Sequence, residues 1–243
     1  EHLKPFEALL SGETVERVET RGKAMLIRFA NAYNIYSHNQ LYGVWMVRKA
    51  YDFPQTKRQL RLAIHNSEQS ALLYSASDIE VLHNQALATH PFLARLGPDL
   101  LDETLTVDAV AARFHAKTFR NKRLTTLLLD QGFLAGTGNY LRSEILFVAG
   151  IHPTLRPADC SEAQIEALAT AALALTRQSY RTGGITNDET RALALKEAGW
   201  TRRDYRFHVF RRAGQSCFTC GEPIVEDRVG GRGIYFCPTC QSI

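Results

Sequence analysis

The sequence lacks any run of eighteen apolar residues, and no basic segment leads into an apolar one near its start. A helix needs about 20 mostly apolar residues to cross a bilayer, so we expect no transmembrane helix. We also expect no secretory signal peptide. Internal repeats and low-complexity tracts are missing too. What remains is an ordinary globular composition in 243 residues, 45% hydrophobic and 22% charged, which suits one large domain or two small ones.

Cysteine is scarce, and its five positions are informative. Four of them form two Cys-x-x-Cys pairs, Cys217 with Cys220 and Cys237 with Cys240, which enclose sixteen residues. An odd count with this pairing argues against a disulfide framework and fits a reducing compartment. Each turn offers two thiolates, and four soft ligands suit zinc; a redox pair would need a βαβ context. We predict one structural zinc and treat Cys160 as a spectator.

Hydrophobic patterning divides the chain into three parts. The first hundred residues have short strand-like runs with turn signals between them, which is typical of a sandwich or barrel. Helical periodicity follows over 106–115, 121–134, 140–150, 165–178 and 188–199, with a capping box at Ser161 and Gln164. A strand is expected over 204–212, leading into a two-stranded cysteine module.

Two basic residues stand at glycine-rich turns. Arg232 lies in "GGRG" inside the cysteine module, where glycines let the backbone approach a partner closely; a solvated turn arginine is the alternative. Lys23 follows Gly22 between two strand-like runs, where its ammonium group could reach a phosphate or a reacting sugar. Most lysines in turns are only solvated, so the turn alone does not decide its role.

The segment "SHNQLYG" joins two strand-like runs. Gln40, Leu41 and Tyr42 are the polar, aliphatic and aromatic side chains that a protein uses to fill a hole in a base stack. The alternative is a buried hairpin in which Leu41 and Tyr42 fold inward. The sequence leaves both open.

Further along, "AGTGN" separates two predicted helices. Asn139 starts the second helix, where free backbone N–H groups and the helix dipole favour an anion such as a DNA phosphate. Asn139 could equally serve only as an N-cap. Arg95 precedes Gly97-Pro98 in the expected linker, where it could contact backbone phosphate or form a linker salt bridge.

The charge distribution favours a polyanionic partner. The net charge is +4, and residues 177–243 alone carry eleven Arg and Lys against seven Asp and Glu, which gives the same +4. A second basic cluster lies at 117–123. This is a mild indication of nucleic-acid binding.

In this order, the motifs resemble the formamidopyrimidine-DNA glycosylase and endonuclease VIII family, and bacterial endonuclease VIII most. The segments that carry the resemblance are "VETRGKAML", "YSHNQLYGVW", "LLYSASDIE", "HPFLARLGPD", "LLLDQGFLAGTGNYLRSEIL" and "CFTC…GGRGIYFCPTC". The resemblance implies an α+β multidomain fold: a β-sandwich over 1–100, a helical helix-two-turn-helix domain over 101–206 and a zinc-ribbon hairpin over 207–243. It also implies a monomer of the bacterial cytoplasm, associated with the nucleoid.

The resemblance implies an activity and a partner. Such enzymes are bifunctional DNA glycosylase/AP lyases that remove oxidised bases from double-stranded DNA and cleave abasic sites by β,δ-elimination. The implied catalytic residues are Lys23 and Arg232. The implied DNA contacts are the gap-filling residues Gln40, Leu41 and Tyr42, together with Arg95 and Asn139 on the DNA backbone. The implied zinc ligands are Cys217, Cys220, Cys237 and Cys240.

Two departures from the family pattern limit these expectations. The family's nucleophile is an N-terminal proline followed by glutamate, whereas this chain opens "EHLKPFEALL". We therefore expect the catalytic tip, the first helix and the first strand of the sandwich to be absent, and a non-catalytic binder of damaged DNA is the alternative function. A zinc-ribbon module of the transcription or translation machinery would explain only the cysteines. The stretch 181–207 is longer than expected for endonuclease VIII. Oxidised pyrimidines are therefore favoured over oxidised purines as the substrate, but the choice between them stays open.

Overall fold

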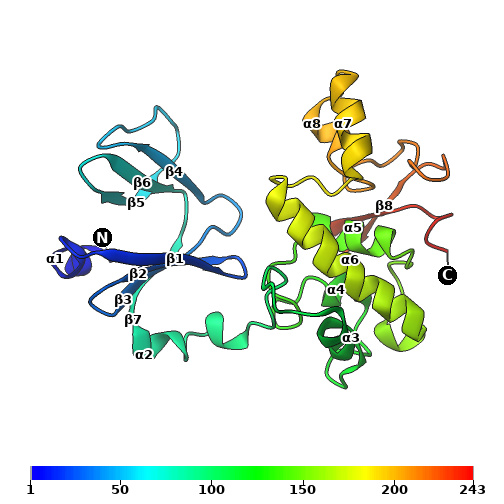
Figure 1. Ribbon diagram of the computed structural model, residues 1–243, viewed down its shortest axis with the longest axis horizontal. Coiled ribbons are helices and arrows are strands. Elements are labelled where there is room, and N and C mark those ends of the chain that lie inside the picture. Colours follow the sequence, from blue (N-terminus) through cyan, green and yellow to red (C-terminus); the bar gives the residue numbers. More distant parts are fainter. Residues whose placement is uncertain (1, 243) are drawn as a thin grey trace. The chain divides into compact units, whose positions relative to one another are not determined.

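The computed structural model describes residues 2–242. The chain forms two compact units that divide between Arg95 and Leu96. The first is built mainly from strands and the second mainly from helices (Figure 1). Within residues 2–242 no helix is long and apolar enough to cross a membrane. The α+β architecture that we predicted is confirmed.

The described part of the first unit contains two antiparallel sheets that make a β-sandwich. Their strand orders are β1-β2-β3-β7 and β4-β6-β5. The strands are β1 Val15–Arg21, β2 Ala24–Phe29, β3 Tyr33–His38, β4 Val44–Lys49, β5 Leu60–His65, β6 Gln69–Tyr74 and β7 Asp78–His83. Because β3 and β4 follow each other in the chain but belong to different sheets, the segment 39–43 must cross from one sheet to the other.

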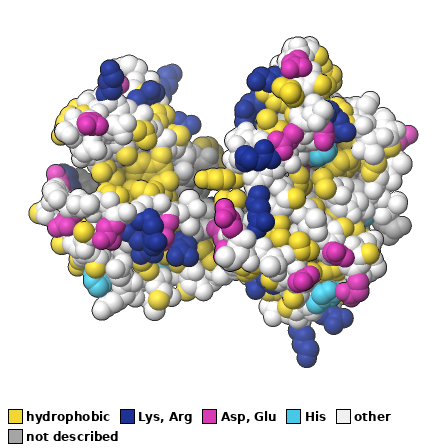
Figure 2. All heavy atoms as spheres, viewed as in Figure 1, with side chains coloured by type: hydrophobic (Ala, Val, Ile, Leu, Met, Phe, Trp, Pro, Cys, Tyr) yellow, Lys and Arg dark blue, Asp and Glu magenta, His cyan; other side chains and the backbone are white. Residues whose placement is uncertain are grey.

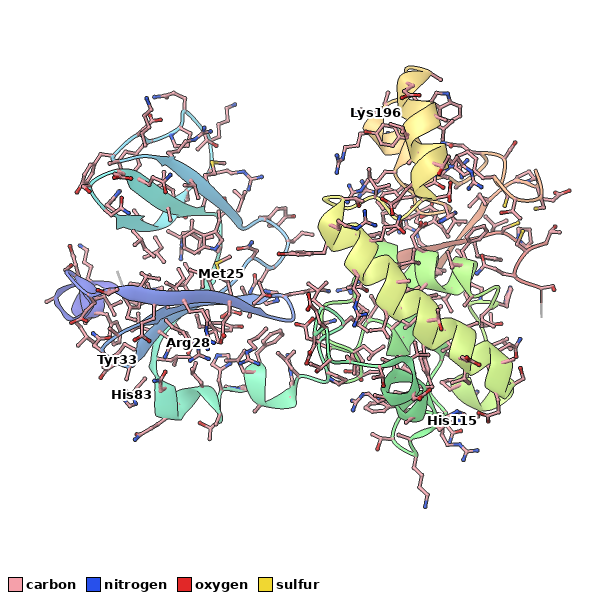
Figure 3. The ribbon with its side chains drawn as sticks, viewed as in Figure 1. Met25, Arg28, Tyr33, His83, His115 and Lys196 are labelled. Carbon is pink, nitrogen blue, oxygen red and sulfur yellow. The ribbon has the colours of Figure 1, made fainter. Side chains whose placement is uncertain are left out.

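Apolar side chains from both sheets make the core of this unit. Ile27, Ile35 and Leu73 are buried there, and each contributes about 1.5–3 kcal/mol relative to an exposed position. Met25 packs against this cluster and lies between the two sheets (Figure 3). Figure 2 shows further hydrophobic side chains gathered on this unit between its sheets. The core fixes the sheets and therefore the turns that leave them.

Short helices flank the sandwich. They are η1 Lys4–Phe6, α1 Glu7–Leu10, α2 Asn84–Leu87 and η2 Leu93–Arg95. The segment after β7 covers one face of the first sheet, where Phe92 and Leu93 pack against the buried Tyr36 cluster. This packing brings η2, which ends at Arg95, onto the sandwich.

The second unit packs helices around one core and adds a small hairpin. Its helices are α3 Val107–His115, α4 Leu124–Leu127, α5 Asn139–Val148, η3 Pro157–Asp159, α6 Glu162–Arg181, α7 Glu189–Glu197 and α8 Arg202–Tyr205. The hairpin is β8 Val225–Val229 and β9 Arg232–Phe236. The capping box of α6 is confirmed, because Ser161 and Gln164 exchange side-chain-to-backbone hydrogen bonds. Ile234 of β9 belongs to the helical core, so the hairpin is anchored on the helices.

The helix predicted over 121–134 is wrong in length, since only α4, Leu124–Leu127, is helical. After α4 the chain makes turns that other partners satisfy. Arg113 donates to the carbonyl groups of Gly132 and Phe133 at 2.7 Å each, and Asp130 accepts from the Gly132 N–H. These bonds replace the ones that a continuing helix would form, and they hold the turns between α4 and α5.

The strand predicted over 204–212 is also wrong. The chain instead forms α8 and a turn in which the N–H groups of His208, Val209 and Phe210 all donate to the Glu144 carboxylate, at 2.8, 2.9 and 2.9 Å. Successive N–H groups of a strand point to opposite sides, so three in a row cannot converge on one anion. A buried partner from α5 therefore overrides the strand-like pattern.

Candidate nucleic-acid interface and metal centre

The four C-terminal cysteines converge on one point. Their sulfur atoms all lie within 4.8 Å of one another, with Cys217 and Cys240 at 3.9 Å and Cys220 and Cys237 at 3.4 Å. Four sulfurs about 2.3 Å from a tetrahedral zinc are about 3.8 Å apart, whereas a disulfide is about 2 Å long. The residues fit zinc, because all four thiols converge on one point, whereas a redox site would need only one Cys-x-x-Cys pair.

Backbone groups favour the thiolate of Cys217, whereas burial raises the pKa of the Cys237 and Cys240 thiols. Burial by itself raises the pKa of the Cys217 thiol, but N–H groups of Cys220 and Thr219 outweigh it and lower that pKa to about 7. Gln241 ties the second pair to the helical core, because its amide accepts from the Cys237 N–H and donates to the Ile151 carbonyl, both at 2.9 Å. Such supporting bonds fix the orientation of the ligands.

The hairpin between the cysteine pairs presents Arg232 near its tip. Gly230 and Gly231 have φ values of 59° and 76°, the left-handed conformation that a tight two-residue hairpin turn needs. Arg232 is the first residue of β9, lies opposite Val229 and is exposed, while Ile234 on the same strand is buried. The prediction of a hairpin with Arg232 near its tip is confirmed.

A buried arginine on α5 holds the base of that tip. Arg142 is only 1% exposed, and its Nη2 donates to the Gly233 carbonyl at 2.9 Å and to Asn139 Oδ1 at 2.7 Å. Its Nη1 donates to the Thr125 carbonyl at 3.0 Å. Burial and the positive charge of Arg232 lower the pKa of Arg142 to about 10. Sequence reasoning missed this residue; a charge inside the apolar pattern "YLRSEILF" was the available signal.

Asn139 has a different local role from the N-cap alternative. The N-cap of α5 is Gly138, and Asn139 is the first helical residue, as predicted. Its Nδ2 donates to the Gly233 carbonyl at 3.1 Å, so Asn139 and Arg142 both support the residue next to Arg232. An amide nitrogen carries two hydrogens, and the second can serve an external acceptor.

Glu144, also on α5, was missed as well. Its carboxylate is fully buried and accepts from Thr186 Oγ1 at 2.7 Å as well as from the three backbone N–H groups of 208–210. Hydrogen bonds to a charged group are the strong ones. The carboxylate thus fixes the segment that leads into the zinc ribbon.

In the first unit, Lys23 lies in the tight turn between β1 and β2 and is exposed. The turn uses Gly22 at a φ of 59°. The charge of Lys23 acts on the ring of His38, the last residue of β3. Lys23 therefore stands on a rigid hairpin next to the start of the 39–43 segment.

That segment, residues 39–43, exposes its two large apolar side chains. Leu41 is 79% exposed and Tyr42 is 69% exposed. The alternative of a buried hairpin with these side chains folded inward is therefore wrong. Apolar side chains this exposed in a short loop are available to a partner.

The loop backbone is nevertheless held in place. Gln40 has a φ of 48°, its N–H donates to His38 Nδ1 at 3.0 Å, and its side-chain Oε1 accepts from Ser77 at 3.0 Å. Arg58 donates to the Tyr42 carbonyl at 2.5 Å. The loop is thus a rigid support for exposed side chains rather than a loose tether.

Arg95 ends η2 and is exposed, with its guanidinium group 5.6 Å from the centre of the Phe92 ring. Among residues 2–242 Arg95 forms no ion pair within 4.0 Å, so the linker salt bridge is wrong. The structure brings Lys23 and the 39–43 loop close to His38 in one unit. It brings Asn139 and Arg232 to Gly233 in the other.

Comparisons with known proteins identify the same helical domain and zinc-binding hairpin. Residues 96–190 match the family model described as the formamidopyrimidine-DNA glycosylase H2TH domain, and residues 214–243 match the zinc finger found in FPG and IleRS. The zinc match and the four converging cysteines establish one structural zinc.

Relatives cover nearly the whole chain. Proteins named endonuclease 8 from Salmonella enteritidis and Salmonella gallinarum are 47% identical over 239 residues, which is 98% of this chain and 88% of each relative. A formamidopyrimidine-DNA glycosylase from Lactococcus lactis, solved with DNA containing an abasic site, has the same fold with a TM-score of 0.81 at 21% identity. That match covers 99% of this chain and 86% of the solved one. The chain therefore belongs to the formamidopyrimidine-DNA glycosylase and endonuclease VIII family.

Proposed function

We propose that this protein removes oxidised pyrimidines from double-stranded DNA and cleaves the strand by β,δ-elimination. The coarser activity, a DNA glycosylase with AP lyase activity in base-excision repair, follows from the family. The observation that carries it is 47% identity to endonuclease 8 proteins over 98% of the chain. The alternative of a non-catalytic binder is not favoured. We place the protein at the bacterial nucleoid.

We assign the 39–43 loop to the gap that a flipped nucleotide leaves. Taking a base out of the stack costs a few kcal/mol, and an apolar wedge offsets part of that cost. Leu41 and Tyr42 have the exposure that a wedge needs, and Gln40 has its backbone fixed beneath them. Lys23 supplies an ammonium group from the neighbouring hairpin, and we assign it to the elimination step.

We assign the backbone of the damaged strand to Arg95, Asn139 and Arg232. A guanidinium group suits phosphate because its N–H groups match two oxygens at once. Arg232 is exposed, and its backbone neighbour Gly233 is held by two donors from α5, so its position is set before DNA binds. We assign Arg232 also to the second elimination, where it would stabilise the departing phosphate.

The choice between oxidised pyrimidines and purines depends on the α7 and α8 segment. In the described residues this segment carries exposed Leu193 and Trp200, at 56% and 44%. It also carries Lys196 on α7 (Figure 3). Figure 2 shows Lys and Arg side chains on this part of the second unit, where Arg202 and Arg203 are exposed. Comparing excision of an oxidised pyrimidine with that of an oxidised purine in the same duplex tests the assignment.

The activity itself is tested by borohydride trapping. A Schiff base between a protein amine and an abasic-site aldehyde is reduced to a stable covalent complex. We assign the nucleophile to no particular residue, and the test uses the full-length protein. A covalent band with abasic DNA, dependent on borohydride, is expected. Strand cleavage without any trapped complex would contradict an amine mechanism. The absence of both strand cleavage and a trapped complex would contradict the proposal as a whole.

Replacing Arg232 with alanine is expected to weaken binding to abasic-site DNA by about 10- to 100-fold, the value of one charged hydrogen-bonded contact. The slope of the logarithm of the affinity against the logarithm of the salt concentration should become shallower by about one, because one counterion fewer is released. Fluorescence polarisation across a salt series measures both. Zinc content should stay at one per chain, because Arg232 is not part of the cysteine cluster.

Arg228→Ala is the matched control for Arg232→Ala. Arg228 is exposed in the same hairpin and carries the same charge, but it pairs with Gly233 and not with Arg232, so its side chain lies on the opposite face of the hairpin from Arg232. The fold-loss of affinity in Arg228→Ala should be less than about a third of the fold-loss in Arg232→Ala. An exposed charge without a specific contact contributes little to binding. Equal losses in the two variants would show that only net charge matters.

A further inference from the structure

The ring of His38 accepts a hydrogen bond from the loop that carries the wedge. Its Nδ1 receives the N–H of Gln40, two residues on, at 3.0 Å. A side chain that accepts from the N–H two residues later closes a local turn, as Asn and Asp do in Asx-turns. The bond fixes the backbone immediately before Leu41 and Tyr42.

This bond stabilises a conformation that the chain would otherwise avoid. Gln40 has a φ of 48°, in the left-handed region that non-glycine residues occupy at a cost. Ser77 bonds the Gln40 side chain, Arg58 bonds the Tyr42 carbonyl, and the Gly43 N–H closes the loop on the Asn39 carbonyl at 2.8 Å. His38 is the side chain that accepts from the N–H of the strained residue Gln40 itself.

The bond requires a neutral imidazole. A nitrogen that accepts an N–H must carry a lone pair, so the ring proton of His38 sits on Nε2. Asp78 of β7 lies opposite His38, Lys23 faces it from the β1–β2 turn, and the Phe92 ring lies 5.1 Å away edge-on. Burial lowers the pKa of His38, Asp78 partly opposes this, and Lys23 adds to the lowering.

We propose that His38 is a positioning residue for the gap-filling loop, which it orders only in its neutral form. Protonation would place an N–H on Nδ1 against the N–H of Gln40, and the turn would lose its acceptor. The proposal deepens the proposed function, because it concerns the same wedge. It assigns to the loop a dependence on acidic pH that comes from His38.

The direction of this dependence follows from the lowered pKa. His38 remains neutral throughout the neutral range, so the loop is ordered there. As the pH falls below the ordinary histidine value of about 6.5, the unfolded or loop-released form takes up a proton before the ordered form does. Loop order, and the affinity for DNA that depends on it, is therefore lost on acidification.

The test uses two substitutions with opposite expectations. In His38→Asn the side-chain oxygen takes the place of Nδ1 and accepts the same N–H, but it does not titrate. In His38→Ala no acceptor remains. Binding to duplex DNA carrying a tetrahydrofuran abasic analogue is measured from pH 7.5 to pH 5.0 for the two variants and the wild-type protein.

At pH 7.5 we expect His38→Asn to bind within about two-fold of wild type and His38→Ala to bind about five-fold more weakly, the usual value of one hydrogen bond. At pH 5.0 the wild-type protein should lose affinity relative to His38→Asn by a similar factor. Other titrating groups act equally on all three proteins. Parallel pH profiles for wild type and His38→Asn would overturn the proposal, as would full affinity of His38→Ala.

A second measurement separates this proposal from the proposed function. Hydrogen exchange of the Gln40 amide in the free protein reports the bond without DNA. Protection should be present in wild type and His38→Asn and lost in His38→Ala. If wild type does not prefer tetrahydrofuran DNA to intact DNA, the proposed function fails, whereas unprotected Gln40 in wild type would overturn the role of His38 alone.

Discussion

Chelation of the zinc is expected to abolish binding to damaged DNA while most of the helical second unit stays folded. The ribbon has a small core of its own, made by Phe147, Val209 and Ile224 with two of the cysteines. Zinc binding to small modules of this kind supplies about 10–16 kcal/mol, which is folding energy for the residues around the metal. Without it, the hairpin loses the geometry that presents Arg232.

The measurement combines zinc content, circular dichroism and affinity. Cys220→Ser should lower zinc content and weaken binding to abasic-site DNA by about 100-fold or more, because at least one charged contact is lost together with its support. Cys160→Ser is the matched control, since Cys160 lies outside the cysteine cluster. Its zinc content and affinity should equal those of the wild type. Full DNA affinity in a zinc-free protein would contradict a structural role of the metal.

Local patterns in the sequence predicted the parts of the site that depend on neighbouring residues. The spacing of the cysteines predicted the zinc centre, and the glycines beside Arg232 predicted the hairpin turn. Turn signals placed Lys23 between two strands and Asn139 at a helix start. At the turns and at the helix start the relevant contacts lie within a few residues, which is the range that turn and helix-end rules describe. The zinc centre joins cysteines that are up to 23 positions apart, and it was predictable because the spacing of two Cys-x-x-Cys pairs is specific.

Long-range partners explain what the sequence could not show. The contacts of Arg142 with Gly233 and of Glu144 with His208 join residues that are 91 and 64 positions apart. The apolar pattern "YLRSEILF" indicates that Arg142 and Glu144 lie on a largely buried helix, but nothing near them in the sequence identifies the distant groups that they bind. The same contact to Glu144 explains why 204–212 is not a strand. Exposure of Leu41 and Tyr42 was undecided for the same reason, because it depends on β3 and β4 entering different sheets.

Arg142→Met is expected to destabilise the second unit by about 2–4 kcal/mol, because it removes hydrogen bonds from buried carbonyl groups without replacing them. The Gly233 carbonyl loses the stronger of its two side-chain donors and keeps Asn139, and the Thr125 carbonyl loses the Arg142 donor. Methionine fills much of the same volume, so a cavity contributes little to this loss. Urea unfolding followed by tryptophan fluorescence and circular dichroism measures the change.

Arg177→Met provides the matched control. Arg177 also donates to two carbonyl groups, those of Asp102 and Leu105, but it is exposed, so water can replace it. We expect Arg177→Met to lower the free energy of unfolding by less than about 1 kcal/mol, as loss of a surface contact does. Similar losses in the two variants would show that burial of Arg142 is not what makes its bonds valuable.

Arg142→Met should also separate stability from DNA binding. Arg142 touches Gly233 and not the exposed Arg232 side chain, so it acts on DNA only by holding the hairpin tip. At a temperature where the variant is fully folded, affinity for abasic-site DNA should fall, and adding Arg232→Ala should cost less than it does in wild type. Non-additivity of this kind is expected for residues that act through one contact. Fully additive losses would mean that Arg142 supports the fold but does not position Arg232. Arg232→Ala alone should leave stability unchanged or slightly raised, because the positive charge that disfavours charged Arg142 is removed.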